Sequence, residues 1–310
     1  MGLSANVALV SEVSKLKTPE LTKVAAALSK QAARDFGPIW KINATVDAFH
    51  TLEDVPSDYW PVIVQEEVDG AAGFHDDENG QPFAVVQHGP GWSVTASHEV
   101  VEMLADPFGR RMRAGTLLQQ AVSLGLPKRR VNYLVEVADP SEAEAYGYQV
   151  NGVQVSDFYT PDFFDPLFAP GVRYSFTGAI KAPRTVLRGG YISWFDPISR
   201  HWMQLRMFQD ELSKKVPHVV DLNNETVFGS LLATMSVRSA IDAVTKPPKA
   251  QTRVKGLALR AINTARTATE HSSSARAAAI RDQLERVRTQ ATAVAVATKA
   301  QRKSTDKRSR

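Results

Sequence analysis

The chain has 310 residues, of which 43% are hydrophobic, and this suffices for a globular protein with a sizeable core. It contains no cysteine, which excludes disulfides, thiolate nucleophiles and every cysteine-based zinc or iron–sulfur site. Any metal ion must therefore be bound by histidine, aspartate and glutamate side chains.

The net charge of +4 conceals two regions of opposite sign. Residues 245–310 contain 16 lysines and arginines against 4 acidic residues, whereas the preceding 244 residues contain 21 basic and 29 acidic residues. We therefore expect an acidic α+β body, residues 1–224, followed by a helical, basic C-terminal extension, residues 225–310.

The extension is open to two interpretations. Its arginines can belong to a solvated alanine-rich helix, or residues 246–310 can bind nucleic acid without sequence specificity through the phosphate charges. It lacks interleaved aromatic side chains for base stacking, which argues against sequence-specific recognition. Self-association through a helix is predicted by a short heptad-like pattern of Ile280, Leu284, Val287, Ala291 and Val294. The last ten residues are expected to be disordered.

Neither a membrane span nor a secretion signal is expected. No run of about 18 apolar residues occurs, and the apolar run near the N-terminus is short and soon interrupted by charge. The sequence therefore predicts a protein that is not secreted through a signal peptide and does not bind a membrane.

The first hundred residues predict a helix followed by strands. Thr18-Pro19-Glu20 places a capping residue, a proline and a carboxylate where helices begin, so a helix is expected to about Phe36. Strands are expected at residues 40–48, 61–64 and 83–87. The glycine-rich stretch 70–80 is predicted to form a turn or loop.

The most informative segment is Ser97-His98-Glu99-Val100-Val101-Glu102. On a helix, residues i and i+4 share one face, so His98 and Glu102 can reach one divalent ion while Glu99 projects beside it, where a general base would stand. Asp106 falls on the same polar arc and, before Pro107, ends the helix. The remaining arc is apolar, so the polar arc faces either solvent, as on an ordinary surface helix, or a functional site.

Later segments predict mostly β structure. A β-rich run at residues 131–137 is followed by Asn151-Gly152 between two short alternating segments, which predicts a hairpin with a type I′ turn over residues 148–155. Residues 158–205 are expected to form irregular loops with short strands. A single helix is predicted from about residue 225 to the prolines at 247 and 248.

The His-Glu-x-x-Glu pattern resembles the metal-binding helix of zincin-type metallopeptidases, in which His-Glu-x-x-His supplies two ligands and the intervening glutamate activates water. The departure is Glu102 at the second ligand position, where a carboxylate is chemically acceptable but makes the site less selective for zinc. The resemblance covers about residues 18–140 and implies a zincin-like body, with a mixed or antiparallel sheet packed on the metal-site helix. The body is also similar to an uncharacterised family of bacterial and phage proteins with GFHD, SHEVVEMLADP, VEVADP and NGVQVSDF segments.

A catalytic metal site requires a third protein ligand. Asp139, where a predicted strand ends, and Glu136, which alternates with valines, are the leading candidates. Each could instead lie on a solvated strand face or in an Asp-Pro turn. Asp106 is expected to orient His98 or to close the helix end.

Other polar residues are weaker candidates. His75 or His88 could polarise a substrate carbonyl, or could simply be solvated in a loop. His201 and Tyr191 are weaker candidates of the same kind. Gly189-Gly190 is an isolated pair, and neither a G-x-x-x-x-G-K-[ST] loop nor a G-x-S-x-G elbow occurs, so nucleotide use is not indicated.

Two functional hypotheses follow. The first is a metal-dependent hydrolase, a peptidase that uses zinc or another divalent metal to cleave a peptide or protein. Its residues are His98, Glu102 and Asp139 or Glu136 as metal ligands, with Glu99 as general base and His75 as a second catalytic group. The second is a non-catalytic structural or assembly protein, cytoplasmic or associated with a virion, whose zincin-like scaffold carries a basic tail that binds nucleic acid or a partner.

Overall fold

The computed structural model describes residues 3–68, 72–78, 80–210, 213, 215–224, 228–233 and 236–245. Predictions about residues 246–310, which include the basic tail and its heptad-like pattern, lie outside this range. Within the described residues, no helix has both the length and the apolar character needed to cross a bilayer. The expected α+β fold class is confirmed, with a five-stranded mixed sheet, a five-stranded antiparallel sheet and a two-stranded antiparallel sheet among the described residues.

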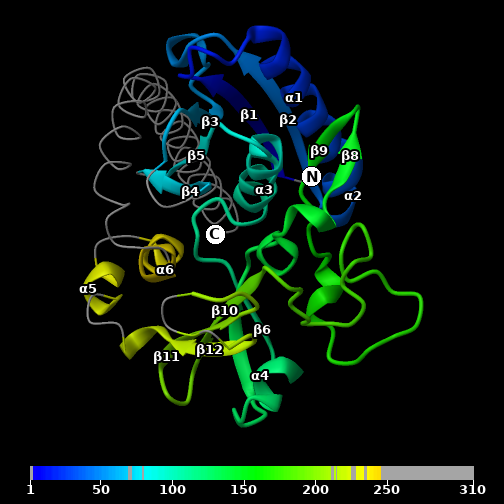
Figure 1. The fold of residues 1–310 in the computed structure, drawn as a ribbon, viewed down its shortest axis with the longest axis vertical. Helices are drawn as coiled ribbons and strands as arrows, with labels where there is room; N and C mark the ends of the chain where they lie inside the picture. Colours follow the sequence, from blue (N-terminus) through cyan, green and yellow to red (C-terminus); the bar gives the residue numbers. More distant parts are fainter. Residues whose placement is uncertain are drawn as a thin grey trace, which may run out of the picture.

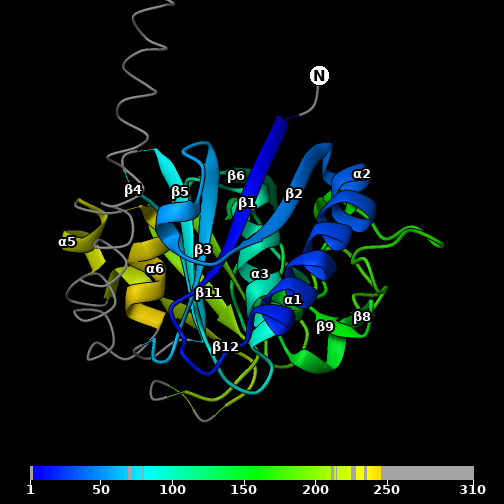
Figure 2. The same ribbon diagram turned by 90° about the horizontal axis from the view of Figure 1, so that it is seen from above.

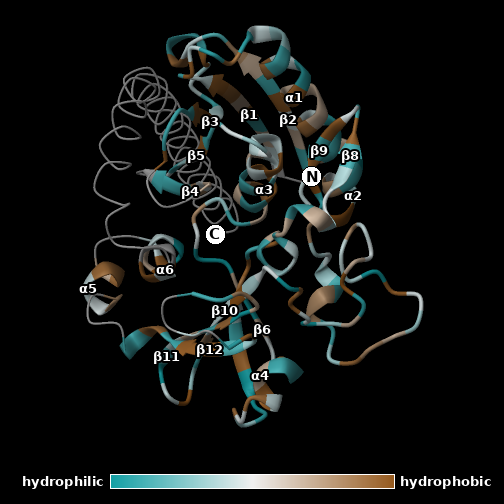
Figure 3. Ribbon diagram, viewed as in Figure 1, coloured by the Kyte–Doolittle hydropathy of each residue, from teal (hydrophilic) through white to brown (hydrophobic). Residues whose placement is uncertain are grey.

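The first sheet has five strands, all parallel except the edge strand β4. In order across the sheet they are β2 (Ile42–Phe49), β1 (Leu3–Ser11), β3 (Tyr59–Gln65), β5 (Gln81–Gln87) and β4 (Gly73–Glu78). Both faces of the central strands are buried, which explains why their sequences are nearly continuous apolar runs. Figure 3 shows the contrast with β4, which is strongly hydrophilic.

Helices α1 (Thr18–Lys30) and α3 (Trp92–Ala105) pack against the same face of this sheet. Their apolar side chains share one core with alternate strand residues, including Val7, Leu9, Val62, Val64, Ala84 and Val86. Figure 2 shows α1 running along the sheet beside β1 and β2. The predicted helix from Thr18 continues as a π-helical segment, Gln31–Phe36, and a short helix α2, Gly37–Trp40.

The second sheet is antiparallel and lies below α3 in Figure 1. In order across it run β12 (His218–Asp221), β11 (His201–Arg206), β10 (Tyr191–Asp196), β7 (Arg130–Leu134) and β6 (Met112–Thr116), with helix α4 (Gln119–Ser123) after β6. The predicted hairpin is confirmed as β8 (Tyr148–Val150) and β9 (Val153–Val155). Asn151 and Gly152 both have positive φ angles, 52° and 71°, as a type I′ turn requires.

Two short helices stand where one was predicted after residue 225. They are α5 (Phe228–Leu232) and α6 (Val237–Thr245), and Ser236 between them is not helical. Ala240 and Ile241 of α6 pack on the second sheet, in a core that also contains Trp202. In Figure 1, α6 lies between β4 and this second sheet.

Two strands of the first sheet escaped the sequence analysis. No element was assigned to residues 3–11, which form β1 between β2 and β3. The loop predicted at residues 70–80 is wrong, because residues 73–78 form β4. The sequence GFHDDE lacks the usual strand composition, and its pairing with β5 provides backbone hydrogen bonds that composition does not reveal.

Candidate functional site

Helix α3 turns its polar arc inward rather than to solvent. The exposed fractions are 8% for His98, 3% for Glu99, 0% for Glu102 and 2% for Asp106. Four buried polar side chains on one helix require partners, since unpaired burial is costly. The surface-helix interpretation of this arc is therefore wrong.

The two ends of α3 are fixed by local chemistry. Gly91 precedes the helix with a φ of 76°, a conformation that favours glycine. At the other end, the Asp106 carboxylate accepts a hydrogen bond of 2.6 Å from the Arg111 backbone N–H, and the Arg111 guanidinium donates to the Ala105 carbonyl at 2.8 Å. Asp106 thus closes the helix end, one of its two expected roles.

A closed ring of three hydrogen bonds connects α3 to two other segments of the chain. The Ser97 hydroxyl donates to Oε1 of Gln31 at 2.7 Å, and Nε2 of Gln31 donates to the Ser156 carbonyl at 2.9 Å. The Ser156 N–H donates back to the Ser97 hydroxyl at 2.8 Å. The ring joins the π-helical segment, α3 and the residue after β9, and all three residues are buried.

The structure brings together His98, Glu102 and Asp139. Nε2 of His98 lies 3.2 Å from Oε2 of Glu102 and 3.4 Å from Oδ1 of Asp139. Two ligands of a tetrahedral site with bonds of about 2.0–2.2 Å are about 3.3–3.6 Å apart, so these separations suit one ion. Oδ1 of Asp139 makes no hydrogen bond in the described part of the chain although it is buried. The three residues fit a divalent cation.

Glu102 is anchored through its other oxygen. Oε1 accepts the backbone N–H groups of Ala138 and Asp139 at 3.1 and 3.3 Å, so the turn after β7 positions this carboxylate as well as supplying Asp139. Burial raises the pKa of Glu102, but His98, Arg238 and His75 outweigh burial and hold the pKa below its usual range. Glu102 is therefore an ionised carboxylate, and its Oε2 faces His98 and Arg238.

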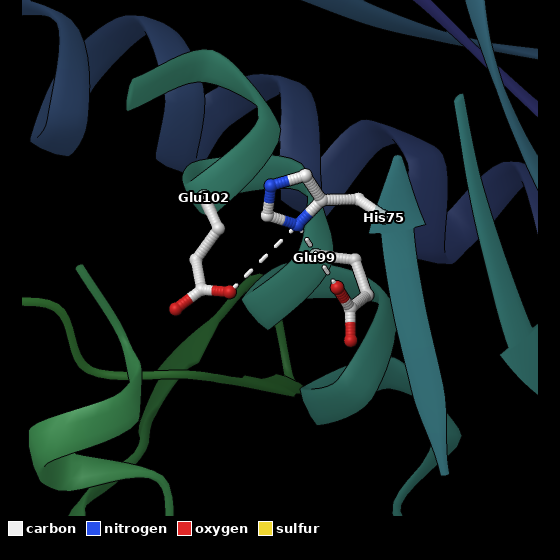
Figure 4. Close-up of side chains that lie close together, drawn as sticks. All are labelled: His75, Glu99 and Glu102. Atoms are coloured by element: carbon white, nitrogen blue, oxygen red, sulfur yellow. Dashed lines mark hydrogen bonds and ion pairs between the residues drawn. The ribbon is translucent and has the colours of Figure 1, made fainter. Parts of the chain in front are cut away.

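A second group shares this carboxylate. Nδ1 of His75 lies 3.3 Å from Oε2 of Glu99 and 3.8 Å from Oε2 of Glu102, as Figure 4 shows. The atoms of this group, like those of the first, lie within 4.8 Å of one another, so each group can hold a metal ion. His75 comes from β4, and a side chain at Gly73 would meet Thr95 of α3 at 2.7 Å, so glycine permits this close approach. The solvated-loop interpretation of His75 is wrong.

Arg238 is the residue of the cluster that sequence analysis missed. Its guanidinium lies 2.7 Å from Oε2 of Glu102 and 3.7 Å from Glu99, and it forms an ion pair with Glu136. It also lies 3.4 Å from Nε2 of His75. Because arginine only donates, this contact favours the tautomer in which Nε2 accepts and Nδ1 of His75 carries the proton toward Glu99, and in that tautomer Nδ1 is not a metal ligand. No spacing signal links position 238 to α3.

Glu136 belongs to the cluster through Arg238 rather than beside His98. Its carboxylate is 6% exposed and pairs with the guanidinium, whereas Asp139 occupies the position beside His98. Of the two candidates for the third ligand, the geometry favours Asp139.

The cluster comprises Glu99, Glu102, Glu136, Asp139, His75, His98 and Arg238. Its guanidinium pairs with three of the four buried carboxylates, those of Glu99, Glu102 and Glu136. One guanidinium cannot balance four carboxylates. Burial raises the pKa of Asp139 well above its usual range, and the Glu102 charge raises it further. Burial lowers the pKa of His98, yet Glu102, Asp139 and Glu99 outweigh burial and raise it well above its ordinary value. Both shifts favour the protonated forms, so bound protons offset part of the negative charge, and a dication would displace these protons.

Tyr159 is a second missed residue. It is fully buried, and its hydroxyl makes no hydrogen bond with any described residue. Burial raises the pKa of Tyr159, and the charges of Glu102, Asp139 and Asp106 raise it further. The backbone N–H of Tyr159 donates to the Val137 carbonyl at 2.7 Å, which places the residue beside the segment that carries Asp139. A tyrosine in an aromatic stretch gave no signal of this role, because its neighbours Phe158 and Phe163 are ordinary core residues.

The weaker candidates lie elsewhere. His201 pairs with Asp221 at 2.7 Å on the second sheet, Tyr191 packs edge-on against Phe208, and the ring of His88 lies beside Trp92. None of His88, His201 and Tyr191 belongs to either group of possible metal ligands in the described residues.

Comparison of the chain with protein-family models, with curated proteins and with solved structures finds no match. The chemistry of the cluster is therefore the guide to the function of this chain.

Proposed function

We propose that this protein is a metal-dependent hydrolase with a zincin-like body, and that it acts on peptides. The observation that carries the proposal is the convergence of His98, Glu102 and Asp139, with a buried Asp139 oxygen that accepts no hydrogen bond from any described residue. These residues would hold zinc or another divalent cation. Such a cation lowers the pKa of bound water toward about 7 and polarises a carbonyl.

The other residues of the cluster have complementary roles. Glu99 projects beside the ligands on α3 and is the general base that takes a proton from the attacking water. Nδ1 of His75 donates to Glu99 and orients its carboxylate at 3.3 Å. His75 is thereby a positioning residue for Glu99 rather than the carbonyl-polarising group expected from sequence.

A peptide substrate is supported by the first sheet. Among the described residues, β4 forms its outermost strand, with β5 as its neighbour on one side, and it carries His75 into the site. The free edge of such a strand offers backbone donors and acceptors to an extended peptide. An extended chain along β4 would bring its carbonyls near Glu99.

Metal analysis of purified variants tests the assignment. We expect one divalent ion per chain in the wild type, its loss in His98→Ala and Asp139→Asn, and its retention in Glu136→Gln, the matched control from the same turn. Glu99→Gln should keep the metal and lose hydrolysis of a peptide library. A metal-free wild type, or an Asp139→Asn variant that binds as the wild type does, would refute the site.

Burial of the cluster favours a second candidate function. Every ligand is at most 8% exposed, and Arg238 already supplies a cation, which also suits a scaffold protein whose ion has a structural role. In that case Glu99→Gln would leave function intact, and a chain without residues 246–310 would lose salt-sensitive DNA binding. The predicted tail function lies outside the described residues.

A further inference from the structure

We propose that α6 is an intramolecular inhibitor, a segment of the chain that closes the metal site and inserts Arg238 as a competing cation. This inference rests on the proposed function, because it concerns regulation of the same site. Two adjacent residues of α6 contact two different parts of the site, Arg238 the Glu102 carboxylate and Ser239 the Asp76 carboxylate on β4.

The contacts of α6 with the site are polar and specific. Arg238 reaches Glu102 at 2.7 Å and pairs with Glu136, and its backbone N–H donates to the Gly109 carbonyl at 3.2 Å. The next residue, Ser239, donates its hydroxyl to Asp76 on β4. Consecutive residues of one short helix therefore connect β4 to the cluster.

These contacts occupy the places that substrate and metal need. The guanidinium lies on Oε2 of Glu102, the oxygen that both possible metal groups share, so it repels a dication approaching that atom. The Ser239 contact lies on β4, the strand along which an extended peptide would pair. With α6 in place, His75 is 1% and Glu99 is 3% exposed, so little space remains for a peptide.

The same helix is short and pairs with no described strand, so it can move without breaking either sheet. It has nine residues, and helices of that length are marginal without tertiary contacts. Its buried apolar residues, Ala240 and Ile241, share a core with Trp202 and Val220 of the second sheet and with Phe228 of α5. Single elements of a protein can open locally while the rest of the protein stays folded. We therefore expect α6 to be able to leave the metal site while the rest of the protein stays folded.

A reducible bridge between β4 and α6 tests the proposal, because the chain contains no cysteine of its own. In the double variant Asp76→Cys/Ser239→Cys, a short bis-methanethiosulfonate cross-linker joins the two cysteines. The rates of the probe reactions are compared before and after reduction of this bridge. The probes are zinc alone, with loading followed by a chromophoric chelator, and carbethoxylation of His75 in metal-free protein, mapped by mass spectrometry. The two single-cysteine variants, treated alike, are the controls.

We expect the bridge to slow zinc loading and His75 modification at least tenfold, and reduction to restore both rates. Equal rates in the bridged and reduced forms would overturn the inhibitory role of α6 while leaving the metal site standing. If the bridge protects His75 but no form of the protein binds zinc, the proposed function is refuted, whereas closure of the site by α6 still holds.

Arg238→Gln provides a second test that needs no bridge. Removal of the competing cation should increase zinc affinity at least tenfold, and Arg238→Lys, which keeps the charge, should not. A lower affinity in Arg238→Gln would show that the guanidinium supports the metal ligands, and this would overturn the proposal.

Discussion

Nη1 of Arg238 lies 2.7 Å from Oε2 of Glu102, and both side chains are almost completely buried. Position 238 is on α6 and position 102 is on α3, so this ion pair connects the last described helix to the central helix of the site. A buried pair of this kind is weak evidence for stability as such, but its disruption leaves an uncompensated charge.

Arg238→Met should therefore destabilise the chelator-treated protein by about 3–5 kcal/mol, because Glu102 and Glu136 lose their guanidinium. Saturating zinc should recover part of this loss, since a ligand that binds only the folded state adds stability. Urea unfolding with and without zinc measures both effects. A loss below about 1 kcal/mol in chelator would contradict the ion-pair assignment.

Gly190→Ala should disturb the metal site at the backbone of Asp139. A methyl group at position 190 would clash with the carbonyl oxygen of Asp139 and lie 2.9 Å from that of Pro140, both of which are backbone atoms. We expect a loss of about 1–3 kcal/mol in stability and weaker metal binding, because Asp139 must move. Gly89→Ala, where an added methyl group meets nothing within 4 Å, is the control and should retain both properties.

Tyr159→Phe separates a structural from a catalytic role for the buried phenol. The hydroxyl has no hydrogen-bond partner among the described residues, so its removal should leave stability unchanged or raise it by about 1 kcal/mol. If the phenol donates to a substrate oxygen during hydrolysis, turnover should fall about tenfold to a thousandfold with metal content unchanged. Thermal unfolding, metal analysis and peptide hydrolysis are measured on the same preparation. Equal turnover would assign Tyr159 to packing alone.

The pH dependence of stability should report on Asp210. Burial raises the pKa of Asp210, but hydrogen bonds from Arg206 and from the Ser213 backbone outweigh it and hold the pKa below its ordinary value. A carboxylate with a lowered folded-state pKa stabilises the protein above its unfolded pKa and loses this contribution as the pH falls through the folded pKa.

Asp210→Asn should consequently cost about 1.5–3 kcal/mol at pH 7, the range for hydrogen bonds to a charged group. The difference from wild type should shrink below pH 4 and vanish at lower pH, as urea unfolding at several pH values would show. The exposed Asp58, whose carboxylate accepts from Asn6, supplies the control, and Asp58→Asn should cost less than about 1 kcal/mol at every pH. A pH-independent loss in Asp210→Asn would argue against the ionic origin of the effect.

Local geometry made part of the site predictable. The spacing of His98 and Glu102 depends only on helical periodicity, and Asp139 follows a strand whose end is marked by Asp-Pro. The helix bounds were also local, because Gly91 and Asp106 mark the two ends of α3 in the sequence. Interactions within a few residues leave a pattern that one sequence can show.

The remaining features arise from contacts between distant segments. β4 is a strand because it pairs with β5, and Arg238 joins the site from a position 136 residues beyond Glu102. Neither pairing leaves a periodic or compositional signal in the segment itself. β1 likewise gains its place from its neighbours β2 and β3 rather than from any motif.

The ring of Gln31, Ser97 and Ser156 has a consequence for binding. None of its members belongs to α6, and Ser97 stands about 140° around α3 from Glu102, so the ring fixes the rotation of the helix independently of Arg238. The arrangement of His98 and Glu102 is thus established during folding. A cation or substrate that enters finds a preorganised site and is spared the entropic cost of assembling it.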